Sequence, residues 1–275
     1  MFAAIVRDTR GCALSDAERF NHFPASPLVA VTYVIEGETR LVPAGGGLVE
    51  AKLMPALAPV TVAGPYSAPL TSWNPGAVFA ISIGFFPDAW SRLTGTTALA
   101  IANKTVSNVP KPLAGMPTPR AGDRDIAAFW EGFCDALEPD WQMARRGSGM
   151  RDSRGANNIA DWANSLIARA AISGAGLSLR AAQRRLRRWA GQSKQSLAFY
   201  ANVENLHRLA VQNEPGQLAG IAHDAGFSDQ SHMGRTVRRA TGFSPALLNR
   251  KIATDESFWC YRLMGERFSR AIAKT

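Results

Sequence analysis

The chain has 275 residues, of which 46% are hydrophobic and 19% charged, so its composition excludes a disordered or fibrous protein. That length suits one large domain or two ordinary ones. Residues 1–150 carry 12 Lys and Arg against 13 Asp and Glu, whereas residues 151–275 carry 19 against 9. The second half therefore holds all of the net charge of +9, which predicts a polyanionic partner for it, either nucleic acid or an anionic membrane surface.

Short strands separated by Gly and Pro are predicted in the first hundred residues. We expect strands at 28–35, 38–42, 59–63, 70–73 and 78–86. Glu36-Gly37 predicts a β-hairpin of the first two strands, and Gly45-Gly46-Gly47 a flexible hairpin tip. Pro87–Leu93 suits a short helix that ends before Gly95. Short strands with frequent turns indicate a small sandwich or barrel.

The hydrophobic period then changes to that of a helix. Apolar residues recur every three to four positions at Ile126, Phe129, Trp130, Phe133, Leu137 and Trp141. This amphipathic helix either packs on the sheet or pairs with a second subunit. The polar, Gly-rich segment 145–158 is the predicted linker, and everything from Ile159 onward indicates helices. We therefore expect an α+β architecture, with a β-rich domain at 1–144 and an all-α domain at 159–275.

The first part of the helical half is basic and free of acids. No Asp or Glu lies between Trp162 and Val203, and Ser178 suits the N-cap of a helix that begins at Leu179. The predicted apolar stripe of that helix is Leu179, Ala182, Leu186 and Trp189 or Ala190. The opposite stripe is Arg180, Gln183, Arg184 and Arg187. Such a helix suits the major groove, where Arg binds guanine edges, Gln binds adenine edges and further Arg residues neutralise phosphates.

A second unit of the same kind follows. A short helix over 218–225 ends at Gly226, Phe227 is an apolar plug, and Ser228 or Asp229 caps the next helix. In that helix Met233, Val237 and Ala240 are expected to face inward, and Gln230, His232, Arg235 and Arg239 outward. Helix, Gly-containing turn and helix is the helix-turn-helix arrangement. A helix over 198–211 would hold both units, so that they enter successive major grooves about 34 Å apart.

These residues carry a resemblance to a known family. The second unit resembles the signature of AraC/XylS-type transcription regulators through Ile221-Ala222-x-x-x-Gly226-Phe227-x-Asp229-Gln230-Ser231-His232-x-x-Arg235-x-x-Arg238-Arg239-x-x-Gly242-x-Ser244-Pro245. The first unit is similar to the first helix-turn-helix of that family through Leu177-Ser178-x-Arg180-x-x-Gln183-Arg184-Arg185-x-Arg187-Arg188-Trp189-x-Gly191-Gln192. The resemblance covers residues 157–250. It implies a double helix-turn-helix joined to a variable N-terminal sensor or dimerisation domain that is often cupin-like, and residues 71–76 resemble some of those domains.

By position in the family motif, the base-facing candidates are Arg180, Gln183 and Arg184 in the first unit and Gln230, Ser231, His232 and Arg235 in the second. Arg187, Arg188 and Arg239 complete the expected DNA-binding set. Three core positions depart from the pattern, since Ala182 replaces a larger apolar residue and Met233 and Val237 replace aromatic ones. Ala201-Asn202-Val203 stands where the family often has Arg, which argues against a phosphate contact there.

Signals for other chemistry are weak. Cys12, Cys134 and Cys260 lie far apart, which suits reduced thiols in a cytoplasmic protein, and the longest apolar stretch falls short of the roughly 20 residues that cross a bilayer. The histidines outside the reading helices, His22, His207 and His223, are expected to pack or to lie at the surface. No zinc spacing, Walker loop or GxSxG motif occurs, so we expect no metal, cofactor or enzymatic activity. Trp73, Trp90, Trp130 and Phe85 suit either the core or an effector pocket.

The sequence therefore predicts a sequence-specific transcription regulator that binds double-stranded DNA. Its N-terminal domain would sense a small-molecule effector, form a homodimer, or both. An enzyme on the N-terminal domain with accessory DNA binding is the alternative. A non-specific binder of nucleic acid or of an anionic surface is a further one.

Overall fold

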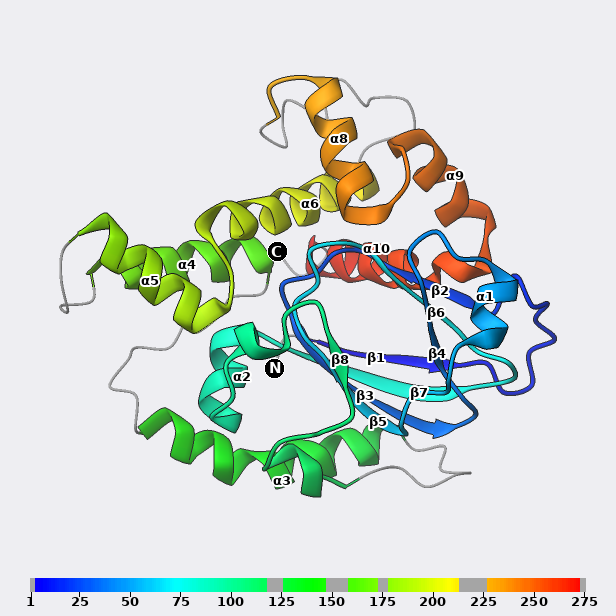
Figure 1. Ribbon diagram of the computed structural model, residues 1–275, viewed down its shortest axis with the longest axis horizontal. Coiled ribbons are helices and arrows are strands. Elements are labelled where there is room, and N and C mark those ends of the chain that lie inside the picture. Colours follow the sequence, from blue (N-terminus) through cyan, green and yellow to red (C-terminus); the bar gives the residue numbers. More distant parts are fainter. Residues whose placement is uncertain (1–2, 118–125, 147–157, 173–177, 213–226, 273–275) are drawn as a thin grey trace.

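A computed structural model describes residues 3–117, 126–146, 158–172, 178–212 and 227–272 of the chain (Figure 1). Strands occupy the first part of the chain and helices the second, which confirms the predicted α+β class with a β-rich region before a helical one. In the described part of the chain, no helix is both long and apolar enough to span a membrane.

The strands form two antiparallel sheets. The five-stranded sheet has the order β1 (Ala3–Asp8), β7 (Phe79–Phe85), β3 (Val29–Glu36), β5 (Val60–Ala63) and β8 (Thr105–Val106). The three-stranded sheet has the order β2 (Phe20–Phe23), β6 (Leu70–Trp73) and β4 (Arg40–Val42). All five predicted strands are confirmed to within about two residues. Strands β1, β2 and β8 were not predicted.

The predicted hairpin of β3 with β4 is wrong. Strand β3 lies between β7 and β5, and β4 pairs with β6 in the other sheet. Gly37, at a φ of 84°, redirects the chain between the sheets, and the Ala77 carbonyl oxygen fills the place of a Cβ. The triple glycine is also not a hairpin tip. It precedes helix α1 (Leu48–Leu53), whose N-cap is Gly47.

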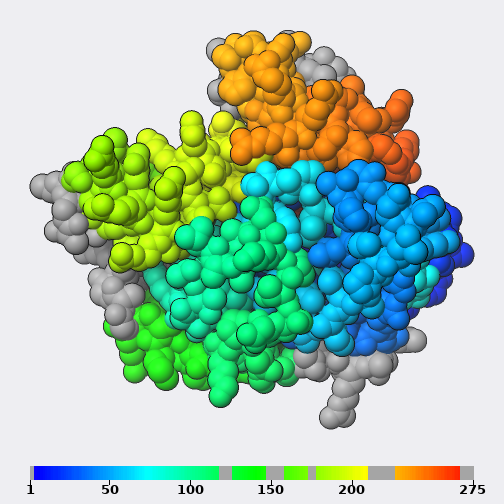
Figure 2. Space-filling model, viewed as in Figure 1, coloured from blue at the N-terminus to red at the C-terminus, as the bar shows by residue number. Residues whose placement is uncertain are grey.

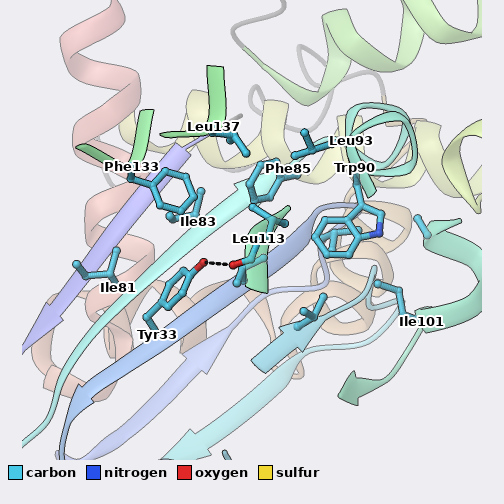
Figure 3. Close-up of a cluster of buried hydrophobic side chains, with 14 of the residues drawn as sticks. Tyr33, Ile81, Ile83, Phe85, Trp90, Leu93, Ile101, Leu113, Phe133 and Leu137 are labelled. Carbon is cyan, nitrogen blue, oxygen red and sulfur yellow. Dashed lines mark hydrogen bonds between the residues drawn. The ribbon is translucent and has the colours of Figure 1, made fainter. Parts of the chain in front are cut away.

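The main hydrophobic core lies on the outer face of the five-stranded sheet. Alternate residues of β3 and β7 are buried there, namely Val29, Val31 and Tyr33 and then Phe79, Ile81, Ile83 and Phe85. Helices α2 (Pro87–Thr94) and α3 (Ile126–Arg146) cover this face with Trp90, Leu93, Phe133 and Leu137, as Figure 3 shows. The Tyr33 hydroxyl donates to the Leu113 carbonyl in the 3-10 helix η2 (Leu113–Gly115).

This core decides between two readings of the aromatic residues. Phe85, Trp90 and Trp130 belong to the core or pack against it, and Trp73 packs in a smaller cluster with Val42 and Ala51. None of these four lines the hollow between the two sheets or the cavity beside α8 (Gln230–Thr241) and α9 (Pro245–Thr254). One face of α3 packs on the sheet, as one of its two interpretations predicted. Pairing of α3 with a second subunit stays a prediction.

The helical part is built around one long helix. Helix α6 (Lys194–Gln212) runs from the pair α4 (Ile159–Ile172) and α5 (Leu179–Ala190) to α8 (Gln230–Thr241), as Figure 1 shows. Helices α9 (Pro245–Thr254) and α10 (Trp259–Ile272) follow, with the 3-10 helix η3 (Glu256–Phe258) between them. The first two residues of the predicted linker belong to α3, and most of the rest lies outside the described residues. So does the predicted helix at 218–225 with Gly226.

Candidate nucleic-acid interface

Helix α5 begins where the sequence predicts. The Ser178 hydroxyl accepts a hydrogen bond from the Ala181 amide at 3.2 Å, which satisfies one of the free donors of the first turn. Gly191 closes the helix at a φ of 66°, and its amide donates to the Arg187 carbonyl at 2.8 Å. The start depends on a local contact, which explains why the sequence alone located it.

The buried face of α5 differs from the predicted one. Ala181, Arg185, Leu186 and Ala190 are buried, whereas Leu179 is 74% exposed and Ala182 is only half-buried. The difference arises because Arg185 turns inward, and its Nε donates to the Ala170 carbonyl at the end of α4 at 2.9 Å. A helix end leaves carbonyls without intrahelical partners, so this bond joins α5 to α4. Arg185 is therefore structural.

The opposite face of α5 is basic and open to solvent. Its five DNA-binding candidates are all exposed: Arg180, Gln183, Arg184, Arg187 and Arg188. The helix contains no acidic residue, so nothing on it opposes a phosphate backbone. The guanidinium and amide groups of this surface can donate hydrogen bonds to base edges and to phosphates.

Helix α8 repeats this construction. Asp229, rather than Ser228, is the N-cap, and its Oδ1 accepts from the His232 amide at 2.7 Å. That hydrogen bond, with a further one from the Ser228 hydroxyl, lowers the pKa of the Asp229 carboxyl, and an anion at a helix N-terminus is favourable. Gly242 ends the helix at a φ of 84°.

The two faces of α8 are as predicted. Met233, Val237 and Ala240 are buried, and Phe227 shares a core with the first two. The five outward candidates are exposed: Gln230, Ser231, His232, Arg235 and Arg239. Two of them contact aromatic rings. The His232 ring meets Phe227 edge to face, and the Arg239 guanidinium lies 4.2 Å from the centre of the Phe199 ring on α6.

Helix α6 joins the two units into one body. Leu197 packs in the core of α4 and α5, and Leu206 packs with Met233 in the core of the second unit. The Glu204 carboxylate accepts from the amides of Ile159 and Ala160 at 2.6 and 3.2 Å, so α6 also caps α4. The relative position of α5 and α8 is therefore set by packing on a shared helix, as the sequence predicts.

The N-terminal part contacts α4 of the first unit through a buried acidic residue. The sequence did not predict this contact. Asp88 of α2 has a side chain only 8% exposed and accepts from Trp162 Nε1 at 2.9 Å and from Arg169 at 2.7 Å. Phe86 stacks on the Trp162 ring, with centres 5.0 Å apart. Asp88 follows Pro87 in a first helical turn, and nothing in the sequence marks it as the partner of a residue 74 positions away.

A different set of contacts joins the N-terminal part to α8 and to η3 and α10, and Figure 2 shows the two parts in continuous contact. The Ala25 amide donates to the Ala240 carbonyl near the end of α8 at 2.7 Å. Trp259 Nε1 donates to Asn21 Oδ1 at 2.8 Å, and Arg7 pairs with Glu256 at 2.6 Å. The α4–α5 pair and the segment from α8 to α10 are therefore each held on the β-rich part by a set of contacts of their own, which we call the first and the second anchor.

His22 belongs to the same interface. Its ring packs against Phe258 and Phe243, with centres 4.6 and 5.8 Å away, and burial together with the nearby Lys251 charge lowers its pKa to about 4. His207 is half-buried, with Nε2 3.1 Å from the Tyr261 carbonyl. Both side chains pack as expected, and His223 lies outside the described residues. Across the described residues, no cluster of three or more His, Cys, Asp or Glu could hold a metal ion.

A hollow lies between the inner faces of the two sheets. Where the outer face of the five-stranded sheet carries Val, Ile and Phe, its inner face carries small and hydroxyl side chains, including Thr32, Thr61, Ala80 and Ser82. The hollow is partly open to solvent and has a cavity volume of about 90 Å³. Asn21 donates to Asn74 at 2.7 Å in its wall. Sandwiches usually pack this layer tightly, so the hollow is a candidate ligand site.

A comparison with protein families agrees with the helical site. Residues 173–251 match a family model described as a helix-turn-helix domain. A search of curated proteins finds no match for this chain. Among solved structures, one of ToxT from Vibrio cholerae shares 11% identity, covers 89% of this chain and 96% of that one, and has a TM-score of 0.40. Unsaturated fatty acid-bound wild-type ToxT from V. cholerae strain SCE256 shares 13% identity, with coverages of 89% and 93% and a TM-score of 0.41.

The match to the helix-turn-helix model spans the capped helices α5 and α8 and the signature residues that follow Phe227. Residues 173–251 are therefore a helix-turn-helix domain of the AraC type, the kind of domain with which transcription regulators bind DNA.

Proposed function

We propose that this protein is a sequence-specific transcription regulator that reads double-stranded DNA with α5 and α8 and responds to a small-molecule effector. One observation carries the proposal. All ten residues selected from the sequence are exposed, although they come from two helices with about 40 residues between them. The same two helices bury Leu186 and Ala190 of α5 and Met233 and Val237 of α8 in cores to which α6 also contributes.

On each reading helix, some of these residues contact base edges and others contact phosphates. On α5, Arg180, Gln183 and Arg184 contact base edges, and Arg187 and Arg188 contact phosphates. On α8, Gln230, Ser231, His232 and Arg235 face the bases and Arg239 a phosphate. Arg suits guanine and Gln suits adenine because each offers two hydrogen bonds in the plane of the base. Base contacts then specify the site, and phosphate contacts supply affinity that falls with salt.

Selection from a pool of random DNA duplexes with the full-length chain tests the proposal. We expect an enriched motif with two half-sites about one helical turn, 34 Å, apart. Binding to that motif should survive an excess of random competitor DNA. Recovery of no enriched motif would contradict base reading and leave a non-specific binder of nucleic acid.

The hollow between the sheets supports the effector part of the proposal. Two antiparallel sheets around a hollow suit the cupin-like sensor domain that the family resemblance implies. We place the protein in the cytoplasm, where it has access to DNA. The described residues that line the hollow include one ionisable side chain, Arg7, and no His, Cys, Asp or Glu. A general acid or base needs such a group, so this lining favours binding over an enzyme on the N-terminal domain.

A further inference from the structure

We propose that the cavity beside α8 and α9 binds a small uncharged molecule with an apolar body and one carbonyl oxygen, such as a short ketone, aldehyde or ester. Bound there, the molecule stabilises the reading helix α8. This cavity is separate from the hollow between the sheets, since the two share none of their described lining residues. The effect on DNA rests on the proposed function, whereas binding of the ligand does not.

The cavity lies in the core of the second helix-turn-helix unit. Its described lining comes from α6, α8, α9 and α10, with Pro24 of the β-rich part. Because Met233 and Val237 stand where the family pattern has aromatic rings, less side-chain volume fills this core. The cavity volume is about 60 Å³. One water needs about 10–15 Å³, so about four to six non-hydrogen atoms fit.

A buried hydroxyl without a partner indicates what such a ligand must offer. Tyr261 of α10 lines the cavity, is only 2% exposed, and has no hydrogen-bond partner for its hydroxyl in the described structure. Two other polar lining residues are engaged. The Thr241 hydroxyl donates to the Val237 carbonyl at 2.8 Å, and His207 Nε2 lies 3.1 Å from the Tyr261 carbonyl. A buried donor without an acceptor is costly, so a ligand oxygen that accepts from Tyr261 removes that cost.

The lining disfavours a charged ligand. The described lining residues include no Lys, Arg, Asp or Glu, and burial lowers the pKa of His207, so its ring is neutral near pH 7. An ion would lose its hydration here without gaining a partner of opposite charge. Burial also raises the pKa of the Tyr261 hydroxyl, which therefore stays protonated and able to donate. A neutral acceptor on an apolar body matches this lining.

A ligand in this cavity contacts the inner face of a reading helix. Met233 and Val237 line the cavity, whereas Arg235 is exposed on the same helix. Atoms that fill a void gain dispersion contacts with its lining, so the ligand holds α8 more firmly against α6, α9 and α10. A helix that is already ordered loses less conformational entropy when it binds DNA. The ligand should therefore strengthen binding to the selected DNA motif.

The experiment compares butanone with 2-methylbut-1-ene, which has nearly the same shape and a CH2 group in place of the carbonyl oxygen. Binding to the full-length chain is followed by NMR of ¹³C-labelled methionine methyl groups. Met233 and Met264 line the cavity, and Met143, which is 71% exposed on α3, is the internal control. Butanone should shift the first two signals at millimolar concentration and leave the third unchanged. Hydrogen exchange of residues 230–241 should slow about threefold or more.

Tyr261→Phe removes the donor and keeps the ring. The ratio of butanone affinity to alkene affinity should fall about fivefold or more from wild type, as expected for one lost hydrogen bond. Tyr200→Phe is the matched control. Tyr200 is also buried in the helical part, but its hydroxyl donates to the Tyr66 carbonyl at 3.2 Å and it does not line the cavity. Its affinity ratio should equal that of wild type.

Two substitutions of Val237 test the place and size of the site. Val237→Phe fills the cavity with a ring and should abolish binding of both probes. Val237→Ala enlarges the cavity and should bind the larger ketone cyclohexanone more tightly than wild type does. The two expected changes have opposite signs, so the second variant keeps the test valid where the larger ring prevents folding.

Several results would overturn the inference. These are shifts of Met233 and Met264 no larger than that of Met143, an affinity ratio unchanged in Tyr261→Phe, or probe binding unchanged in both Val237 variants. Butanone binding without slower exchange at 230–241 would refute the action on α8. An enriched DNA motif without butanone binding removes this inference alone. Butanone binding without an enriched motif removes the proposed DNA reading and leaves the ligand site.

Discussion

Arginine serves opposite purposes at different positions of this chain. Arg185 is buried and bonds the Ala170 carbonyl, whereas Arg184, its neighbour in sequence, is exposed. Arg169 lies in the buried contact with Asp88, and Arg7 lines the hollow. What separates these roles is whether the side chain has a protein acceptor within reach or faces solvent, where a polyanion can approach.

Arg184 and Arg187 test the division between base and phosphate contacts on one helix. We expect Arg184→Ala to lose about 1–3 kcal/mol of discrimination at one base pair of the selected site. We expect Arg187→Ala to weaken all sequences alike and to lower the slope of log affinity against log salt by about 1. Fluorescence anisotropy on the selected site and its single-base variants, at several salt concentrations, measures both. Identical behaviour of the two variants would contradict the assignment.

Asp88→Asn tests the buried contact between α2 and α4. The amide can still accept from Trp162, but it leaves the Arg169 guanidinium buried without a carboxylate, which costs about 3–5 kcal/mol when a buried pair loses one partner. Thermal and urea unfolding should show this loss. Asp8→Asn is the matched control, because the partly exposed Asp8–Arg10 pair should contribute at most about 1 kcal/mol. Equal effects of the two substitutions would show that burial of Asp88 does not matter.

At the scale of elements, both reading helices depend on the same end chemistry. An oxygen side chain caps each start, from Ser178 and Asp229, and a glycine with positive φ closes each end, at Gly191 and Gly242. The cap of α8 is the carboxylate of Asp229, whereas the cap of α5 is the uncharged hydroxyl of Ser178. Only the cap of α8 can therefore respond to pH.

The Asp229 cap should weaken in acid. Its folded pKa lies below the unfolded value near 3.8, so its stabilising contribution is present above that value and is lost as pH falls through the folded pKa. Hydrogen exchange of residues 231–233, referenced to the intrinsic rate at each pH, should show protection falling below about pH 4. Asp229→Asn keeps an acceptor without a titrating charge, and its protection should not change in that range. A wild-type profile that matches the variant would rule out the charged cap.

At the scale of the molecule, contacts of α4, of α6, where the Tyr200 hydroxyl donates to the Tyr66 carbonyl, and of the segment from α8 to α10 hold the helical part on the β-rich part. Asp88 serves the α4–α5 unit, and Arg7, Asn21 and Ala25 serve the unit that contains α8. Because α6 also joins the two units, loss of the contacts of one anchor leaves the contacts of the other in place. Such an arrangement permits an effector to act on one reading helix more than on the other.

His22 makes the second anchor sensitive to pH. Its pKa of about 4 in the fold lies below the unfolded value of 6.5, so the unfolded chain binds the extra proton first and stability falls as pH drops from 6.5 towards 4. Lys251 and Asp255 are the charged groups that act on it, and they oppose each other. The thermal midpoint should fall across this range in wild type and fall less in His22→Gln. His207 titrates in the same direction, so the difference between the proteins is the measured quantity.

Local chemistry made α5 and α8 predictable from the sequence. Caps, helix ends and the exposure of ten polar or basic residues depend on neighbours within about four positions. Five strands could be located for a similar reason, because alternation and turn residues are local signals. The pairing of β3 was not predictable, since register and partner depend on which apolar faces meet over long separations.

The hollow, the inward turn of Arg185 and the anchors at Asp88 and Arg7 emerged only in three dimensions. Each joins residues that lie 15 to 249 positions apart, and no spacing in the sequence marks such pairs. Alternate residues of β3 and β7 form one strongly apolar face and one face with Ala, Thr and Ser as well as Val34. Only the packing of α2 and α3 on the first face, and of a second polar-lined sheet opposite the other, made one the core and the other the wall of a cavity.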